Sequence, residues 1–267
     1  MAYAEFRYVT TNLYQSGASA NPIIAELPFT DVNYTTQLNS YGTFQGSVLL
    51  SGINSTNLNV YNGTIPVKTI LWVLYTDPVT YTEIPVWSGV IQQRTYDSAS
   101  QRLDITAQEM VSLYMKRRIS TTQTYTAQNP AAIAKALFQY AEGKTHGNTG
   151  LTYATVPVTG YSTTREFQGY EYKSVYQSVK DLAQNFFDFI IKPYNTGGVL
   201  TNKLINRLHD CPFFGYFDND KLLTMINFMY CPENKEPYNS AFIGINLATN
   251  TIPLDRDVSK LPSSLLK

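Results

Sequence analysis

The segment Lys68–Tyr75, KTILWVLY, decides the fold class of this chain. From Ile70 onward its residues are apolar without interruption, so both faces of an extended segment need to be covered. Asp77 and Pro78 then end the run, because both residues favour turns. The segment therefore predicts the central strand of a β-rich domain. It is far shorter than the roughly 20 apolar residues of a membrane-spanning helix, and we expect no membrane span.

Further strand patterns lie on both sides of this segment, from Phe6 to about Thr106. Asn39–Gly42 is a predicted turn, and Gly46 in the strand that follows leaves room for a bend or a close neighbour. The turn Asp97–Ser100 separates two alternating segments, which is typical of an antiparallel pair. Residues 108–118 then change to helical spacing. These patterns predict one β-rich domain that ends in a helix.

Residues 121–195 are expected to form a small α+β module between β-rich parts. Asn129 can cap a helix, Pro130 suits its first turn, and apolar residues recur at helical spacing up to Ala141. Ser174 is a plausible cap for a second helix. Two strand patterns complete the module, at residues 151–158 and 187–191. The fold class is therefore mainly β with an α+β insertion.

Large apolar residues at buried positions of these patterns are the candidates for the structural core. They are Phe44, Trp72, Trp87, Leu137, Leu182 and Phe186. Leu182 and Phe186 belong to the apolar stripe expected for the second helix, because they lie one helical turn apart. Cys211 and Cys231 are interpreted as buried thiols, although the two could form one disulfide bridge.

The composition favours wide, uncharged contact surfaces. The 267 residues have a formal net charge of zero, so nothing global attracts the chain to nucleic acid or to an anionic membrane. Charged residues make up 15% of the chain, whereas 21 residues are tyrosine. Such a tyrosine excess is typical of β-structure and of subunit interfaces, and a sugar-stacking surface is the alternative. No secretory signal is visible at the N-terminus, and we expect assembly in the cytoplasm.

His209, Cys211 and Cys231 are the candidate metal ligands. Structural zinc sites contain close ligand pairs, such as two cysteines separated by two residues, and that pairing is absent here. Asp218–Asp220 resembles the start of a calcium loop, but Leu222 occupies the third ligand position. We therefore predict neither a metal site nor a cofactor.

The candidates for catalysis and for DNA binding are weak. Ser88 follows Trp87, whereas a nucleophile elbow has a glycine two residues before its serine. His146 lies in a loop rich in Gly and Thr, where a solvated histidine is expected. Lys116–Arg118 is interpreted as a solvated helix end. A glycosidase carboxylate pair leaves no sequence pattern, because its members need only meet in space. We predict that the protein is not an enzyme and binds no specific nucleic-acid sequence.

Several motifs follow one another over roughly the first 195 residues. They are ELPF at Glu26–Phe29, Leu38-Asn39-x-x-Gly42-x-Phe44-x-Gly46, the Trp72 strand, Val86–Ile91, Arg94-x-Tyr96-Asp97, Leu103-x-Ile105-x-Ala107, Pro130-x-x-Ile133-x-x-x-Leu137 and Leu182-Ala183-x-x-x-Phe187-Asp188-Phe189. By their order and spacing, and not by any single motif, they resemble the minor tail proteins of the siphophage tail-tip hub family, which are similar to baseplate hubs.

The resemblance implies a fold with two β-barrel-like hub domains. Residues 1–120 would form the first barrel-like domain and its terminal helix, and residues 121–195 the α+β module. Residues 196–267 would be a β-rich return segment that completes a second barrel or makes contacts in the tail tip. Here the sequence departs from the family pattern.

The resemblance also implies a structural virion protein. Three copies would form a hub at the tail tip that closes the distal end of the tail tube. Its partners would be the hexameric ring proteins of the tube or distal tail, the C-terminus of the tape measure protein, and other tip or receptor-binding proteins. The alternative is a receptor-binding or glycan-binding tail module that uses tyrosines of the terminal third.

Overall fold

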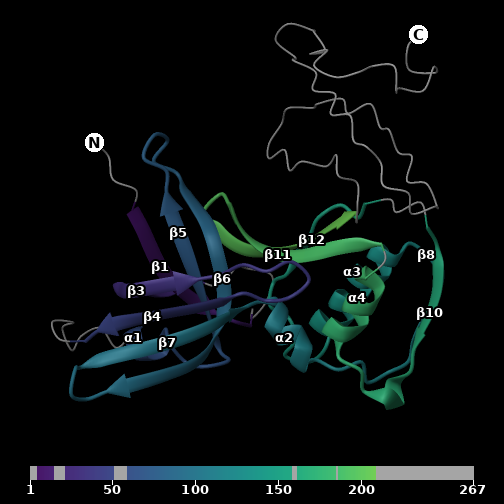
Figure 1. The fold of residues 1–267 in the computed structure, drawn as a ribbon, viewed down its shortest axis with the longest axis horizontal. Coiled ribbons are helices and arrows are strands. Elements are labelled where there is room, and N and C mark those ends of the chain that lie inside the picture. Colours follow the sequence, from purple (N-terminus) through teal and green to yellow (C-terminus); the bar gives the residue numbers. More distant parts are fainter. Residues whose placement is uncertain (1–4, 15–21, 51–58, 158–160, 185, 209–267) are drawn as a thin grey trace, which may run out of the picture. The chain divides into compact units, whose positions relative to one another are not determined.

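A curled seven-stranded β-sheet lies beside a module of helices and shorter strands (Figure 1). The computed structural model describes residues 5–14, 22–50, 59–157, 161–184 and 186–208, all within one unit of the chain. The mainly β class with an α+β module is confirmed.

The structure contains the following strands and helices. The strands are β1 (Glu5–Asn12), β2 (Ile23–Glu26), β3 (Phe29–Tyr34), β4 (Thr43–Leu49), β5 (Thr69–Thr76), β6 (Glu83–Asp97), β7 (Arg102–Glu109), β8 (Gln123–Gln128), β9 (Thr152–Tyr153), β10 (Thr163–Phe167), β11 (Phe187–Thr196) and β12 (Val199–Leu208). The helices are α1 (Asn59–Asn62), α2 (Val111–Lys116), α3 (Pro130–Glu142) and α4 (Val175–Ala183), with the 3-10 turn η1 at Gly169–Glu171.

The large sheet has the strand order β2-β1-β5-β6-β7-β4-β3. Its two end strands, β2 and β3, are separated in sequence by Leu27 and Pro28 alone. Two residues span only about 10 Å, so the sheet must curl until its ends lie near each other. Leu27 stays attached to β1, because its N–H donates to the carbonyl of Tyr8 at 2.9 Å. The ends are not hydrogen-bonded to each other, and the sheet is an open, barrel-like half-cylinder.

Strand β5 is covered on both faces, as its apolar run predicts. Leu71 and Val73 point into one cluster, which we call the sheet core, and Trp72 points into the other, the shared core. The sheet core comprises Ala25, Leu27, Phe44, Val48, Leu71, Val73, Trp87, Ile91, Leu103, Ile105 and Ala107. The shared core joins Ile70, Trp72, Leu74 and Val90 of the sheet to buried residues of α2, α3, α4 and β11. The sheet and the module therefore share one core.

The caps predicted for the two longer helices are confirmed. Asn129 accepts a hydrogen bond from the N–H of Ala131 at 2.9 Å, and Pro130 is the first residue of α3. The hydroxyl of Ser174 accepts from the N–H of Gln177 at 3.1 Å at the start of α4. Both bonds satisfy N–H groups that have no partner inside the helix.

Strand β12 ties the segment after residue 195 to the module. It pairs with β11 over ten residue pairs, from Phe187 opposite Leu208 to Thr196 opposite Val199. Its other neighbour is β9, which runs parallel to it and contains two residues where the pattern predicted a strand over 151–158. Residues 196–208 thus belong to the three-stranded sheet β11-β12-β9. A second barrel within residues 209–267 lies outside the described residues.

Five of the six core candidates are buried in these clusters, with at most 2% of their surface exposed: Phe44, Trp72, Trp87, Leu137 and Leu182. Phe186 differs and is only partly buried, at the margin of the shared core. Helix α4 ends at Ala183, so Phe186 no longer follows the helical stripe of Leu182. Its ring packs instead against Tyr161, with ring centroids 5.2 Å apart.

Trp87 is the strongest point at which to test the sheet core. It is 1% exposed, packs 5.5 Å from the Phe44 ring and donates its indole N–H to the carbonyl of Thr35 at 3.0 Å. Trp87→Ala should lower the free energy of unfolding by about 3–5 kcal/mol, because it leaves a cavity. Tyr96→Ala, at an exposed position of the same strand, should change it by less than about 0.5 kcal/mol. Urea unfolding compares the two, and equal losses would contradict the assigned packing.

Candidate functional site

Asn39 forms a joint between the large sheet and the module. Its backbone N–H donates to the carbonyl of Phe189 at 3.0 Å, and its side-chain oxygen accepts from the N–H of Phe189 at 2.8 Å. The side-chain amide donates to Asp188, and the carbonyl of Asn39 accepts from the Tyr176 hydroxyl at 3.0 Å. Asn39 has a φ of 55°, a left-handed conformation that asparagine tolerates better than most residues. The predicted turn is therefore a docking point for β11.

Glu109, the last residue of β7, holds the same loop from the other side. Its carboxylate accepts from the N–H of Gly42 at 2.5 Å and from the N–H of Gln37 at 3.4 Å. Burial raises the pKa of Glu109, and these backbone hydrogen bonds oppose the increase. A Cβ atom at Gly42 would lie 1.8 Å from the carbonyl oxygen of Thr35, so a side chain there would displace the loop. Residues 35–42 are thus held on both sides.

A second polar cluster joins α2 to α3 and to the loop that follows. Glu142 forms a largely buried ion pair with Arg117 at 2.6 Å and accepts from the Tyr114 hydroxyl at 2.7 Å. Its other oxygen accepts from the N–H and hydroxyl of Thr149 at 2.6 and 2.9 Å. Arg117 also donates to the carbonyl of Gly147 at 2.6 Å. The interpretation of Lys116–Arg118 as a solvated helix end is wrong for Arg117, because its side chain is largely buried in this ion pair. Its partner lies 25 residues away along the chain.

Tyr140, near the end of α3, has an unusual hydroxyl environment. Its oxygen accepts from the backbone N–H groups of Ser120 and Thr121 at 3.0 and 3.1 Å. The hydroxyls of the same two residues lie 3.1 and 3.0 Å away. The Lys144 ammonium lies 4.0 Å from the ring centroid. Burial raises the pKa of Tyr140, but hydrogen bonding by Lys144, Ser120 and Thr121 outweighs it and lowers the pKa to about 7.

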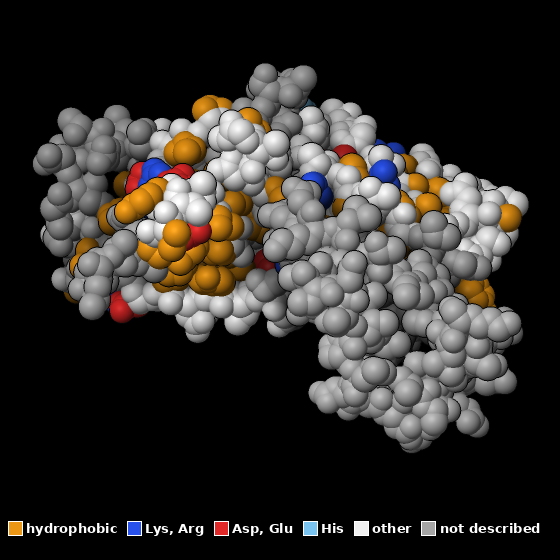
Figure 2. All heavy atoms as spheres, turned by 90° about the horizontal axis from the view of Figure 1, so that it is seen from above, with side chains coloured by type: hydrophobic (Ala, Val, Ile, Leu, Met, Phe, Trp, Pro, Cys, Tyr) orange, Lys and Arg blue, Asp and Glu red, His pale blue; other side chains and the backbone are white. Residues whose placement is uncertain are grey.

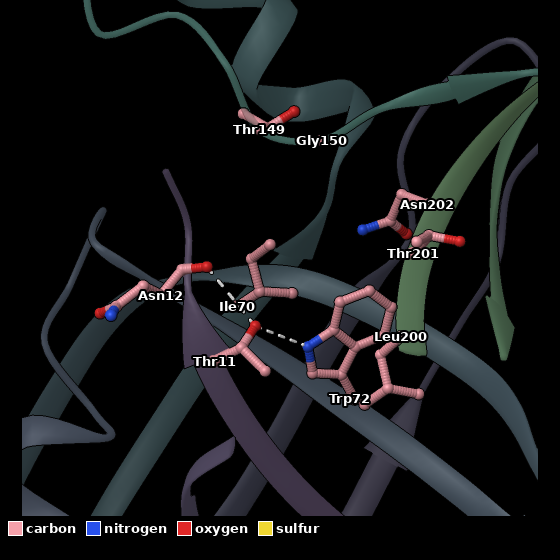
Figure 3. Close-up of a pocket in the computed structure, with 9 residues that line it drawn as sticks. All are labelled: Thr11, Asn12, Ile70, Trp72, Thr149, Gly150, Leu200, Thr201 and Asn202. Carbon is pink, nitrogen blue, oxygen red and sulfur yellow. Dashed lines mark hydrogen bonds between the residues drawn. The ribbon is translucent and has the colours of Figure 1, made fainter. Parts of the chain in front are cut away.

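A small cavity lies between the sheet, the loop after α3 and β12 (Figure 3). It has a volume of about 10 Å³ and is lined by Thr11, Asn12, Ile70, Trp72, Thr149, Gly150, Leu200, Thr201 and Asn202. The indole N–H of Trp72 donates to the Thr11 hydroxyl at 2.9 Å on one wall, as Figure 3 shows. The space suits about one water molecule.

Of the residues considered for catalysis or metal binding, the structure describes Ser88 and His146. Ser88 is buried and its hydroxyl donates to the side-chain oxygen of Asn202 at 2.5 Å. His146 is exposed in the loop after α3, with a φ of 57°. The described residues contain no group of three His, Cys, Asp or Glu side chains that could hold a metal ion. His209, Cys211, Cys231 and Asp218–Asp220 lie outside the described residues.

Tyrosine is divided between the core and the surface. Tyr114 and Tyr176 are buried, whereas six tyrosines are more than half exposed: Tyr61, Tyr81, Tyr96, Tyr161, Tyr170 and Tyr172. Seen from above, hydrophobic side chains gather over the half of the molecule that holds the large sheet (Figure 2). Among the tyrosines of the terminal third, considered for glycan contact, Tyr194 lies on β11 with the Lys203 ammonium 4.3 Å from its ring centroid. Tyr216, Tyr230 and Tyr238 lie outside the described residues. No helix in the described part of the chain has the length and apolar character to cross a membrane.

Comparison with known proteins finds similarity in structure and not in sequence. The sequence matches no protein-family model and no curated protein. A chain of the Francisella PdpA–VgrG complex, in its lidless form, is similar in structure with a TM-score of 0.50 at 11% identity. The match covers 76% of this chain and 35% of that chain. The likeness shows a fold shared with that chain.

Two further solved structures match with lower TM-scores. The Escherichia coli c3393 protein, a type VI secretion component described as similar to the T4 bacteriophage tail proteins gp27 and gp5, has a TM-score of 0.39 at 9% identity, over 75% of this chain and 45% of its own. A tail protein of Neisseria meningitidis has a TM-score of 0.39 at 10% identity, over 74% and 50%. This chain thus spans half or less of the length of each.

The Asn39 joint is open to a direct test. Asn39→Ala removes two side-chain hydrogen bonds, leaves the N–H of Phe189 without its acceptor and places alanine at a positive φ. The free energy of unfolding should fall by about 2 kcal/mol. Amide hydrogen exchange at Phe189 should accelerate most. Asn33→Ala, at an exposed position of β3, is the control and should have little effect. Unchanged exchange at Phe189 would contradict the joint.

Tyr140 should titrate near pH 7 as a separate step in the near-ultraviolet absorbance of tyrosinate. Tyr140→Phe should remove this step, whereas Tyr96→Phe should retain it. Because the folded pKa is lowered from its usual 10.0, the stabilisation by the phenolate is complete above pH 10 and is lost as the pH falls through about 7. Wild type should therefore gain stability over Tyr140→Phe as the pH rises from 7 to 10. Absence of any absorbance change in this interval would refute the assignment.

Proposed function

We propose that this chain is a structural virion protein of a bacteriophage tail, a homotrimeric hub at the tail tip. The observation that supports it most directly is the fold, which is shared with the PdpA–VgrG chain over 76% of this chain. The ordered sequence motifs favour a tail-tip hub within that fold. Asn39 and Gly42 belong to one of these motifs, and both hold the loop that joins sheet and module.

The described unit has the properties of a rigid building block of a larger assembly. The large sheet and the module share one core and are fastened by Asn39, and the Glu142 cluster joins α2 to α3. A unit fastened in this way keeps its interaction surfaces in fixed geometry, which lowers the cost of ordering them during assembly. The exposed tyrosines offer large contact areas without charges that would need desolvation.

In this proposal the protein acts through fit and closure, without bond chemistry. Three copies close the distal end of the tail tube below the hexameric rings of the tube or distal tail. The hub contacts the C-terminus of the tape measure protein and anchors other tip or receptor-binding proteins. Assembly takes place in the host cytoplasm, and the mature location is the tail tip of the virion. A closed ring suits a protein whose open sheet has the end strands β2 and β3, because assembly can cover such edges.

The proposal predicts two results. Light scattering of the purified full-length chain should give the mass of three 30.1 kDa copies. Gold-labelled antibodies against the chain should mark the distal end of the tail in purified virions. A chain that stays monomeric at all concentrations and is also missing from virions would overturn the proposal. Labelling along the tube or at the capsid would show a structural role at another position.

A further inference from the structure

The hairpin between β5 and β6 exposes apolar side chains at its tip. Val79 is 82% exposed, the highest fraction among the large hydrophobic residues that the structure describes, and Tyr81 is 75% exposed. In Figure 1 this hairpin projects beyond the neighbouring strands of the sheet. Isolated exposed hydrophobic residues are common, but two at one protruding tip indicate a contact surface.

Asp77 fixes the conformation of this tip. Its carboxylate accepts from the N–H of Val79 at 2.8 Å and from the hydroxyl of Thr80 at 2.9 Å. The N–H of Tyr81 donates to the carbonyl of Asp77 at 2.8 Å, and the N–H of Asp77 donates to the carbonyl of Thr82 at 3.0 Å. Pro78 further restricts the backbone. Val79 and Tyr81 are therefore presented by an ordered turn, which lowers the entropy lost on binding.

The hairpin between β6 and β7 provides an internal comparison, because it has the same turn. Asp97 accepts from the N–H of Ala99 at 3.0 Å and from the hydroxyl of Ser100 at 2.6 Å. Gln101 has a φ of 50°, and Tyr81, at the equivalent position, has a φ of 53°. One scaffold thus carries valine and tyrosine, and the other carries alanine and glutamine. The turn itself does not require the large apolar residues, so another constraint must select them.

An apolar row lies at the base of the β5–β6 hairpin. Phe6, Tyr75 and Ile84 are cross-strand neighbours on β1, β5 and β6, and the Phe6 and Tyr75 rings are 5.5 Å apart. Phe6 and Ile84 are each 45% exposed. The row is two residue pairs from the tip, since Thr76 pairs with Glu83 and Asp77 bonds to Thr82. One end of the sheet therefore carries both a protruding tip and a partly exposed apolar row.

We infer that the tip of one copy, Val79 and Tyr81, packs on the row Phe6, Tyr75 and Ile84 of a second copy. The contact rests on the proposed function, since it names the surface through which the copies of the hub would associate. Each copy offers both halves of the contact, which is the requirement for a head-to-tail ring. Tip and row together expose on the order of a few hundred Å² of apolar surface, which suits the apolar centre of an interface of about 800 Å² per partner.

Charge favours a protein surface over other partners. Residues 75–84 contain two carboxylates, Asp77 and Glu83, and no lysine or arginine. Arg7, the nearest described cation on β1, already pairs with Glu26 at 2.7 Å and with Glu83. An anionic membrane or a nucleic acid would meet net negative charge here and be repelled. An uncharged apolar row avoids this repulsion.

Photo-cross-linking tests the contact in the full-length chain. Tyr81 is replaced by p-benzoylphenylalanine, and heavy-isotope-labelled and unlabelled chains are mixed before illumination. The contact predicts mixed-isotope cross-links from position 81 to peptides that contain Phe6, Tyr75 or Ile84. Cross-links between chains that map to other peptides would overturn the contact, while self-association itself would still support the proposed hub.

A pair of matched variants tests the energetic role of the tip. Val79→Ser with Tyr81→Ser should weaken self-association about tenfold or more, as measured by sedimentation. Ala99→Ser with Gln101→Ser, in the equivalent turn, should change it less than about twofold. Thermal unfolding checks that both variants fold. Equal association of the two variants would overturn the inference. A chain that stays monomeric and binds phosphatidylcholine vesicles through its tip would also overturn the inference. If antibodies still marked that chain at the tail tip, the proposed location would stand.

Discussion

The rest of the structure depends on the burial of β5 on both faces. Leu71 and Val73 need one apolar partner layer, and Ile70, Trp72 and Leu74 need another. The sheet supplies the first layer by curling until β2 and β3 approach each other. Helices α2, α3 and α4 with β11 supply the second. Each large side chain contributes roughly 1.5–3 kcal/mol when it leaves water, so neither face could remain open. The hydrophobic effect thus makes sheet and module one unit.

Apolar packing has little directional preference, and polar contacts set how the module docks. Asn39 makes three hydrogen bonds to β11, which require one register of β11 against the loop, and a fourth to Tyr176 of α4. Glu109 and the Glu142 cluster hold the segments on either side. Leaving any of these partly buried groups without a partner costs about 1–3 kcal/mol. Alternative docking modes are disfavoured by that cost.

This division of roles bears on the proposed hub. The fold is shared with the PdpA–VgrG chain at only 11% sequence identity, so the architecture tolerates wide replacement of apolar residues. Surface features such as the Val79 and Tyr81 tip are free of that packing requirement. At such surface positions, a protein with this fold can acquire contacts that are specific to its own assembly. Fold and assembly specificity are then carried by different residues.

The sequence by itself determined the features that depend on near neighbours. These are the two-sided strand β5, the caps Asn129 and Ser174, and the Asp97 turn, because each rests on residues a few positions apart. Only the tertiary structure decided that Arg117 pairs with Glu142, that Asn39 docks on Phe189 and that Phe186 lies at the core margin. The partners of Arg117 and Asn39 lie 25 and 150 residues away along the chain. No local pattern encodes such a meeting, because it follows from the curl of the sheet and the packing of the whole unit.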